Sequence, residues 1–131
     1  MQNAAASYAR TAQITQSPRE LEASLLLKAA YRLQVVGDEW HTADQALVPA
    51  LTYNRRIWTI LSTSATEPTN PLPDGIKVAI ASLAGFIFQR TISVMAEPAP
   101  EKLAALIRIN RDIAAGLRGS AAAPALAAAA G

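Results

Sequence analysis

Apolar residues recur at helical spacing in four stretches of the chain, and turn or capping residues bound each stretch. The first begins at Ser17, the N-cap, with Pro18 at the first helical position and Glu20 three residues after the cap, which together form a capping box. Leucine and alanine then repeat at helical spacing as far as Gly37, a natural C-cap. These signals predict a helix from Ser17 to Gly37.

The second and fourth stretches are amphipathic in the same way. The second runs from residue 42 or 43 to Leu61, and Pro49 inside it predicts a kink or a later start. Residues 62–73 are dense in Ser, Thr and Pro and predict a loop. The fourth runs from about residue 101 to residue 117, after a connection that contains two prolines.

The third stretch, residues 73–97, is apolar on every side of a helical wheel and carries no charge between Lys77 and Arg90. A helix that is apolar all round is buried all round. Its uncharged part is shorter than the roughly 20 residues that a membrane span needs, so we expect no membrane insertion. The pattern predicts an all-α fold, a small antiparallel bundle of about four main helices around this buried central helix.

The chain of 131 residues fits a single domain, which we place at residues 1–119. Within it, residues 3–14 are rich in alanine and could add a frayed helix. Residues 120–131 are almost entirely alanine, and we expect a disordered tail there. The alternative for this tail is a short apolar segment that docks on a partner.

The amino-acid composition limits the classes of function that this protein can have. Hydrophobic residues make up 51% of the chain and charged residues only 17%, which suggests that part of the apolar surface is covered by a partner or lies in the tail. The net charge is only +2 and there is no run of Lys or Arg, so we do not expect a nucleic-acid-binding protein. The single histidine, His41, and the absence of cysteine leave no metal-ligand set, and no phosphate loop or nucleophile elbow occurs. We expect no enzyme, no cofactor and no metal site.

One unit, Asn-Arg-x-Ile, occurs twice, at residues 54–57 and 110–113. In each copy the asparagine lies on the apolar stripe of its helix and the arginine points off it. One interpretation is a buried asparagine pair that bonds to backbone or to its twin and fixes the helix register. The other is a groove that recognises polar groups of a partner helix. The candidate partner-binding residues are Asn54, Arg55, Arg56, Trp58, Asn110 and Arg111.

Five motifs in order resemble the family of the flagellar regulator FlaF. They are SPRE at 17–20, NRRIW at 54–58, NPLP at 70–73, IASLAGFIF at 80–88 and LIRINR at 106–111. The resemblance covers roughly residues 8–119. The chain departs from the family pattern after Leu61, where Ser62 and its neighbours stand in place of a frequent acidic residue, and in the alanine tail.

The resemblance implies a bacterial cytoplasmic protein of flagellum biogenesis that acts on flagellin, in partnership or opposition with an FlbT-type flagellin regulator. With the predicted bundle, it favours a chaperone that binds unpolymerised flagellin, because the ends of flagellin are amphipathic helices that a groove could hold. An alternative is a post-transcriptional regulator that acts directly on flagellin mRNA, with Arg55 and Arg56 beside Trp58 as the nearest RNA-binding candidates. A third possibility is an adapter that contacts only other flagellar regulators.

Overall fold

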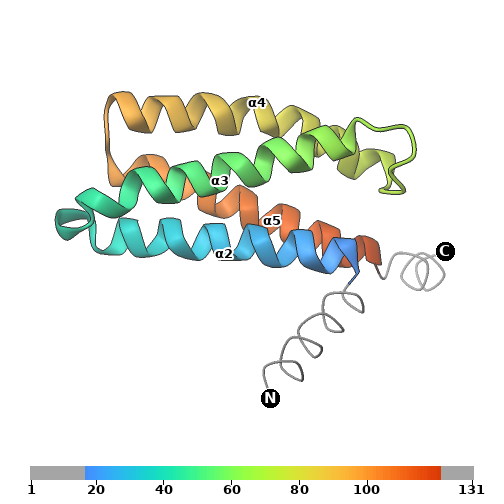
Figure 1. Ribbon diagram of the computed structural model, residues 1–131, viewed down its shortest axis with the longest axis horizontal. Helices are drawn as coiled ribbons and strands as arrows, with labels where there is room; N and C mark the ends of the chain where they lie inside the picture. The colour runs from blue at the N-terminus through green and yellow to red at the C-terminus, as the bar shows by residue number, and fades with distance from the viewer. Residues whose placement is uncertain (1–16, 122–131) are drawn as a thin grey trace, which may run out of the picture.

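The computed structural model describes residues 17–121, which form four α-helices and two short 3-10 turns (Figure 1). No strand occurs in these residues, so the predicted all-α class is confirmed. The first two residues of the predicted tail belong to the last helix, and the rest of that tail lies outside the described residues, as does the helix expected at residues 3–14. The elements are α2 (Pro18–Asp38), η1 (Trp40–Thr42), α3 (Asp44–Ala65), α4 (Asp74–Ala96), η2 (Pro100–Lys102) and α5 (Leu103–Ala121).

The start of α2 follows the sequence prediction. The Oγ atom of Ser17 accepts a hydrogen bond from the backbone N–H of Glu20 at 3.1 Å, which is the N-cap half of a capping box. The Glu20 carboxylate instead reaches Arg118 on α5, with Oε2 3.3 Å from Nε. The predicted end at Gly37 is wrong by one residue: α2 continues to Asp38, and no described residue, glycine included, has the positive φ of a glycine C-cap.

Helix α3 is longer than predicted and runs through Pro49 to Ala65. Serine and threonine in its last turns do not break it, and their hydroxyl groups donate to backbone carbonyls one turn earlier. Thr63 Oγ1, for example, donates to the carbonyl oxygen of Thr59 at 2.7 Å. The predicted loop is therefore confined to the residues between α3 and α4.

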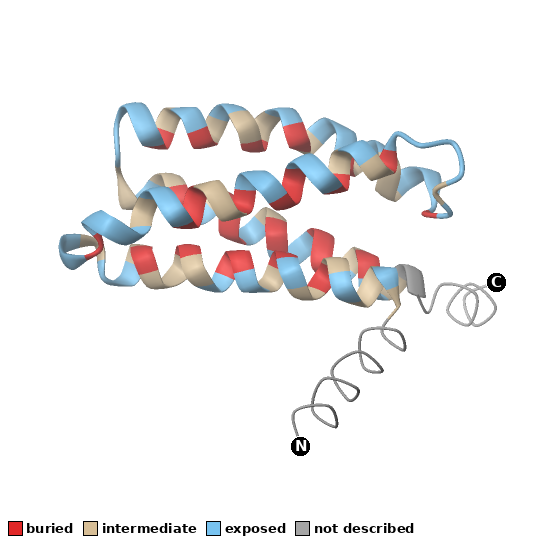
Figure 2. Ribbon diagram, viewed as in Figure 1, coloured by how far each residue is buried: buried red, intermediate tan, exposed pale blue. Residues whose placement is uncertain are grey.

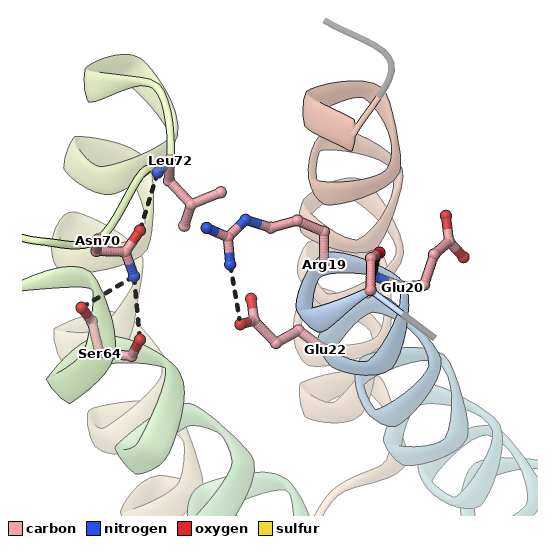
Figure 3. A network of polar contacts seen from close by, with 7 residues as sticks. Arg19, Glu20, Glu22, Ser64, Asn70 and Leu72 are labelled. Atoms are coloured by element: carbon pink, nitrogen blue, oxygen red, sulfur yellow. Dashed lines mark hydrogen bonds and ion pairs between the residues drawn. The ribbon is translucent and has the colours of Figure 1, made fainter. Parts of the chain in front are cut away.

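Asn70 holds this loop together. Its Nδ2 atom donates to both the carbonyl oxygen and the Oγ atom of Ser64, each at 3.0 Å, and its Oδ1 atom accepts from the N–H of Leu72 at 2.9 Å (Figure 3). Leu72 is thereby placed with its side chain buried in the core. The asparagine of the NPLP motif thus has a structural role.

The four helices pack in a layered order. Helix α2 packs against α5 and α3, and α4 packs on α3 and α5, so α2 and α4 lie on opposite sides of the bundle (Figure 1). The largest fully buried apolar side chains come from all four helices: Leu26, Leu33, Leu51, Trp58, Ile80, Ile87, Val94, Leu103, Leu106 and Leu117.

The prediction that residues 73–97 form the buried centre of the bundle is wrong. Helix α4 buries one face through residues such as Ile80 and Ile87, while its opposite face is exposed along its length (Figure 2). On that face Val78 is 64% and Ile92 67% exposed. A helix that is apolar on all sides is usually covered on all sides. In α4, however, the described residues cover only one face, and the opposite face is exposed.

The same helix is, among the described residues, the one that is long and apolar enough to cross a bilayer by length and composition alone, and 28% of its most apolar window is buried. Core helices of soluble proteins share these properties, so they do not identify a membrane protein. What remains to be explained is the uncovered apolar face.

Candidate partner-binding site

The two asparagines of the repeated unit meet inside the bundle. Nδ2 of Asn110 on α5 donates to Oδ1 of Asn54 on α3 at 2.6 Å, and also to the backbone carbonyl of Leu26 on α2 at 3.3 Å. The Nε1 atom of Trp58 donates to Oδ1 of Asn110 at 2.8 Å. This network joins three helices and confirms the interpretation of a buried asparagine pair bonded to its twin and to backbone.

Helical spacing explains how the network forms. Asn54 and Trp58 are four residues apart on α3 and therefore lie on one face, which is turned toward α5. Asn110, in the middle of α5, reaches both of them. One donor of the network, Nδ2 of Asn54, is buried and has no hydrogen-bond partner within residues 17–121. A group of this kind costs about 1–3 kcal/mol, so the network fixes register at some expense of stability.

Three of the six candidate partner-binding residues are therefore not surface residues. Asn54, Trp58 and Asn110 are each fully buried, and in the folded protein they contact other helices instead of a partner. Their assignment to a partner-binding surface is corrected by this burial. The candidates that stay exposed are the arginines at positions 55, 56 and 111.

The exposed arginines do not border one shared groove, as the repeated unit had suggested. Arg55 lines a groove of about 330 Å³ between α3 and α4, whereas Arg111 lines a separate hollow of about 570 Å³ between α2, η2 and α5. The two hollows have no lining residue in common. Arg111 has charged neighbours there, Glu101 and Asp112 among them, so its surroundings are polar.

The groove beside Arg55 is apolar. It is lined by Phe88, Thr91, Ile92 and Met95 of α4 and by Arg55 and Thr59 of α3, so Arg55 is its one charged lining residue. The groove opens onto the exposed face of α4, which adds Val78 and an uncharged run of residues. An apolar surface with a cation at its edge suits an amphipathic helix that carries a carboxylate beside its apolar stripe.

Two cations near the C-terminal half of α4, Arg90 and Lys102, are engaged in other contacts. Arg90 lies over the ring of Phe86, 5.0 Å from its centroid, and Lys102 donates from Nζ to the carbonyl oxygens of Glu97 at 2.8 Å and Ser93 at 3.3 Å. Cations at such carbonyls complement the C-terminal end of a helix dipole. They leave the outward face of α4 uncharged.

A smaller hollow of about 110 Å³ lies between the first turns of α2 and the second half of α3. Glu22 lines it together with apolar residues that include Leu25 and Ile60. Nη1 of Arg19 contacts Oε1 of this carboxylate at 3.4 Å (Figure 3), and Oε2 is buried with no hydrogen-bond partner among the described residues. Burial raises the pKa of Glu22 above its ordinary value, and the charge of Arg19 partly offsets this.

Sequence reasoning did not predict the burial of Glu22, although a signal was present. Its position three and four residues before Leu25 and Leu26 places the carboxylate on the side of α2 that faces the rest of the bundle. The described part of the chain contains no group of three or more His, Cys, Asp or Glu that could hold a metal ion, and His41 lies exposed in η1.

Comparison with known proteins gives the family. The model of the flagellar protein FlaF family matches residues 4–117, which is most of the chain and reaches from before α2 into α5. The chain belongs to the FlaF family. No curated protein and no solved structure matches it significantly. The resemblance drawn from the five motifs is confirmed, and the chain is a flagellar protein.

The FlaF motifs now have physical roles. SPRE caps α2, NRRIW and LIRINR supply the buried network, and NPLP supplies the asparagine that holds the α3–α4 loop. In this chain these motifs therefore contribute to the fold. The exposed arginines of these motifs, Arg55 and Arg111, take no part in the buried network.

Proposed function

We propose that this FlaF family protein binds unpolymerised flagellin in the cytoplasm and acts as a chaperone that regulates flagellin supply. The observation that carries the proposal is the uncharged, exposed face of α4 together with the α3–α4 groove. Exposed apolar side chains that gather beside a groove, as Ile92 and Met95 do, are typical of interaction sites. An amphipathic helix from an end of flagellin is a partner with matching chemistry, because its apolar stripe is left uncovered until it polymerises.

The groove supplies both parts of such a contact. Ile92 and Met95, both exposed, provide apolar contact area, and Arg55 provides a charge at the rim. A rim charge tunes the association rate and specificity more than the affinity. The same face could hold an FlbT-type regulator, which would then compete with flagellin for this protein.

The alternative of direct binding to flagellin mRNA receives less support. Single-stranded RNA is bound by exposed aromatic side chains on which bases stack. Trp58, the aromatic residue beside Arg55 and Arg56, is fully buried and engaged with Asn110. The two exposed arginines are left without a stacking residue next to them in the NRRIW motif.

The deciding experiment is isothermal titration calorimetry, in which purified monomeric flagellin is titrated into the full chain and the affinity is measured. Ile92→Lys should weaken binding at least tenfold, because it places a charge in the apolar contact. Ile60→Lys is a matched control: Ile60 is 70% exposed against 67% for Ile92, but it does not line the α3–α4 groove. Absence of binding by the natural chain at tens of micromolar would refute the chaperone proposal, and equal effects of the two variants would refute the choice of groove.

A further inference from the structure

The exposed side of α4 contains a line of residues that runs from one end of the helix to the other (Figure 2). These residues are spaced alternately four and three apart, which keeps them on one side of a helix and is the spacing of a coiled-coil seam. All six are exposed and none carries a charge: Val78, Ser82, Gly85, Gln89, Ile92 and Ala96. We call this surface the α4 seam.

The α4 seam is symmetric about its central residue. Gly85 lies in the middle of α4, with eleven residues of the helix on either side. The two large apolar residues of the seam are equally far from it, because Val78 comes seven residues before it and Ile92 seven residues after it. Two antiparallel copies of α4 that cross at Gly85 would therefore place Val78 of each copy against Ile92 of the other. The seam is self-complementary, as a twofold dimer interface has to be.

The glycine at the centre of the seam is not explained by packing within the bundle. Glycine destabilises the middle of a helix relative to alanine. A Cβ atom at position 85 would meet no atom within 4 Å, so the packing of the described residues does not require a glycine there. Where two helices cross, however, the absence of a side chain allows their backbones to approach closely. A second copy of α4 would account for Gly85.

The charged residues at the ends of α4 favour the antiparallel direction. Asp74 and Lys77 lie in the first turns of the helix, and Glu97 follows its last residue. Lys102 belongs to the same end as Glu97, because its Nζ atom donates to the carbonyl oxygen of Glu97 at 2.8 Å. An antiparallel pair brings Asp74 of one copy to the end where Lys102 of the other lies, and Lys77 to the end where Glu97 lies. A parallel pair would instead place each charge beside its own copy, and like charges repel.

We propose that two copies of this protein pair through the α4 seam, with the helices antiparallel and Gly85 at the crossing point. The pairing covers Val78 and Ile92 in both copies, and it supplies the cover that the apolar composition of α4 predicts. One helix from each chain makes a small interface, so we expect a weak dimer that depends on concentration. Ile92 also lines the α3–α4 groove, so paired chains would have to separate before flagellin binds there. The pairing itself does not depend on flagellin.

Sedimentation equilibrium of the full chain, without flagellin, tests the pairing. The average mass should rise from that of one chain toward that of two as the concentration is raised to several hundred micromolar. Gly85→Leu places a side chain at the crossing point and should weaken the association at least tenfold. Gly119→Leu in α5 is the matched control and should leave the association unchanged, because a Cβ atom there also meets no atom within 4 Å.

Two results of this experiment would overturn the proposal. One is a mass that stays at one chain throughout, and the other is a dimer that survives Gly85→Leu. A chain that remains monomeric but binds flagellin would overturn the pairing alone and would leave the chaperone proposal standing, with the α4 seam free for that partner.

Disulfide trapping tests the antiparallel register without changing Gly85. The protein has no cysteine, so Val78→Cys and Ile92→Cys each introduce a single exposed thiol. When the two variants are mixed in equal amounts and oxidised with copper(II) phenanthroline, the disulfide between the two different chains should form faster than either self-disulfide. Ile60→Cys, at an exposed position on α3, measures cross-linking by random collision. Faster self-disulfides, or rates no higher than that of Ile60→Cys, would overturn the proposal.

Discussion

The indole nitrogen of Trp58 donates a hydrogen bond to Oδ1 of Asn110, 2.8 Å away, between two fully buried side chains on α3 and α5. Asn110 also donates to Asn54 and to the backbone of α2. A displacement of any of the three helices along its axis would break at least one of these bonds. The network therefore specifies helix register, which apolar packing alone specifies poorly.

The first prediction concerns Trp58, the donor of the hydrogen bond to Oδ1 of Asn110. Trp58→Phe retains most of the apolar volume but leaves Oδ1 of Asn110 buried without its donor, so we expect a loss of about 1–3 kcal/mol in the free energy of unfolding. Trp58→Ala adds a cavity and should cost about 3–5 kcal/mol. Urea unfolding followed by circular dichroism measures both, with Trp40→Phe in η1 as the control. If Trp58→Phe kept full stability, the hydrogen bond would have no structural importance.

The second prediction compares the two asparagines. Asn110 makes three hydrogen bonds in the network, whereas Asn54 accepts one and leaves its own Nδ2 unpartnered. Asn110→Ala should therefore destabilise the protein more than Asn54→Ala, although both remove the same side chain from a fully buried position. Urea unfolding of both variants shows which of them loses more free energy of unfolding. A larger loss for Asn54→Ala would show that the donor geometry described above is not what stabilises the core.

The sequence predicted the elements well because their signals are local. The serine cap, the apolar spacing and the Asn-Arg repeat depend on residues within a few turns of one another. The helix ends were less predictable. The Ser- and Thr-rich end of α3 stays helical, with hydroxyl groups bonded back to carbonyls of the same helix, although its composition predicts a loop.

The surface was harder to predict than the core, and for a physical reason. The apolar pattern of α4 predicts a helix that is covered on every side, but the structure of the described residues covers only one face. The position of Asn54 on an apolar stripe likewise fits a buried residue or a groove residue. Only the tertiary contact of Asn54 on α3 with Asn110 on α5 distinguishes them, and these two residues are 56 positions apart.

The third prediction separates the two exposed arginines of the repeated unit. Arg55 lines the apolar α3–α4 groove and Arg111 lines a polar hollow elsewhere. If flagellin binds along α4, Arg55→Glu should slow association severalfold with little change in the melting temperature, because a rim charge acts mainly on the encounter. Arg111→Glu is the matched control and should leave the rate unchanged. Biolayer interferometry measures both, and a slower rate for Arg111→Glu alone would move the binding site to the α2–α5 side.

The last prediction uses the partly buried carboxylate of Glu22. Burial raises its pKa above 4.5, and Arg19 acts in the opposite direction. Arg19→Gln should therefore raise the pKa of Glu22 further, which a carboxyl ¹³C titration by NMR measures directly. A pKa that stayed the same or fell would show that the contact at 3.4 Å has no electrostatic effect.

The same change has a defined pH dependence. A carboxyl group whose pKa is higher in the folded than in the unfolded state binds more protons when folded, so its contribution to stability is lost as the pH rises from 4.5 through the folded pKa. Because Arg19→Gln raises that folded pKa, the variant should lose stability relative to the natural chain at neutral pH. Below pH 4.5, where Glu22 is increasingly protonated in both states, the difference should shrink. Arg118→Gln, which removes an exposed pair with Glu20, is the control and should show a smaller change, because solvent screens that pair.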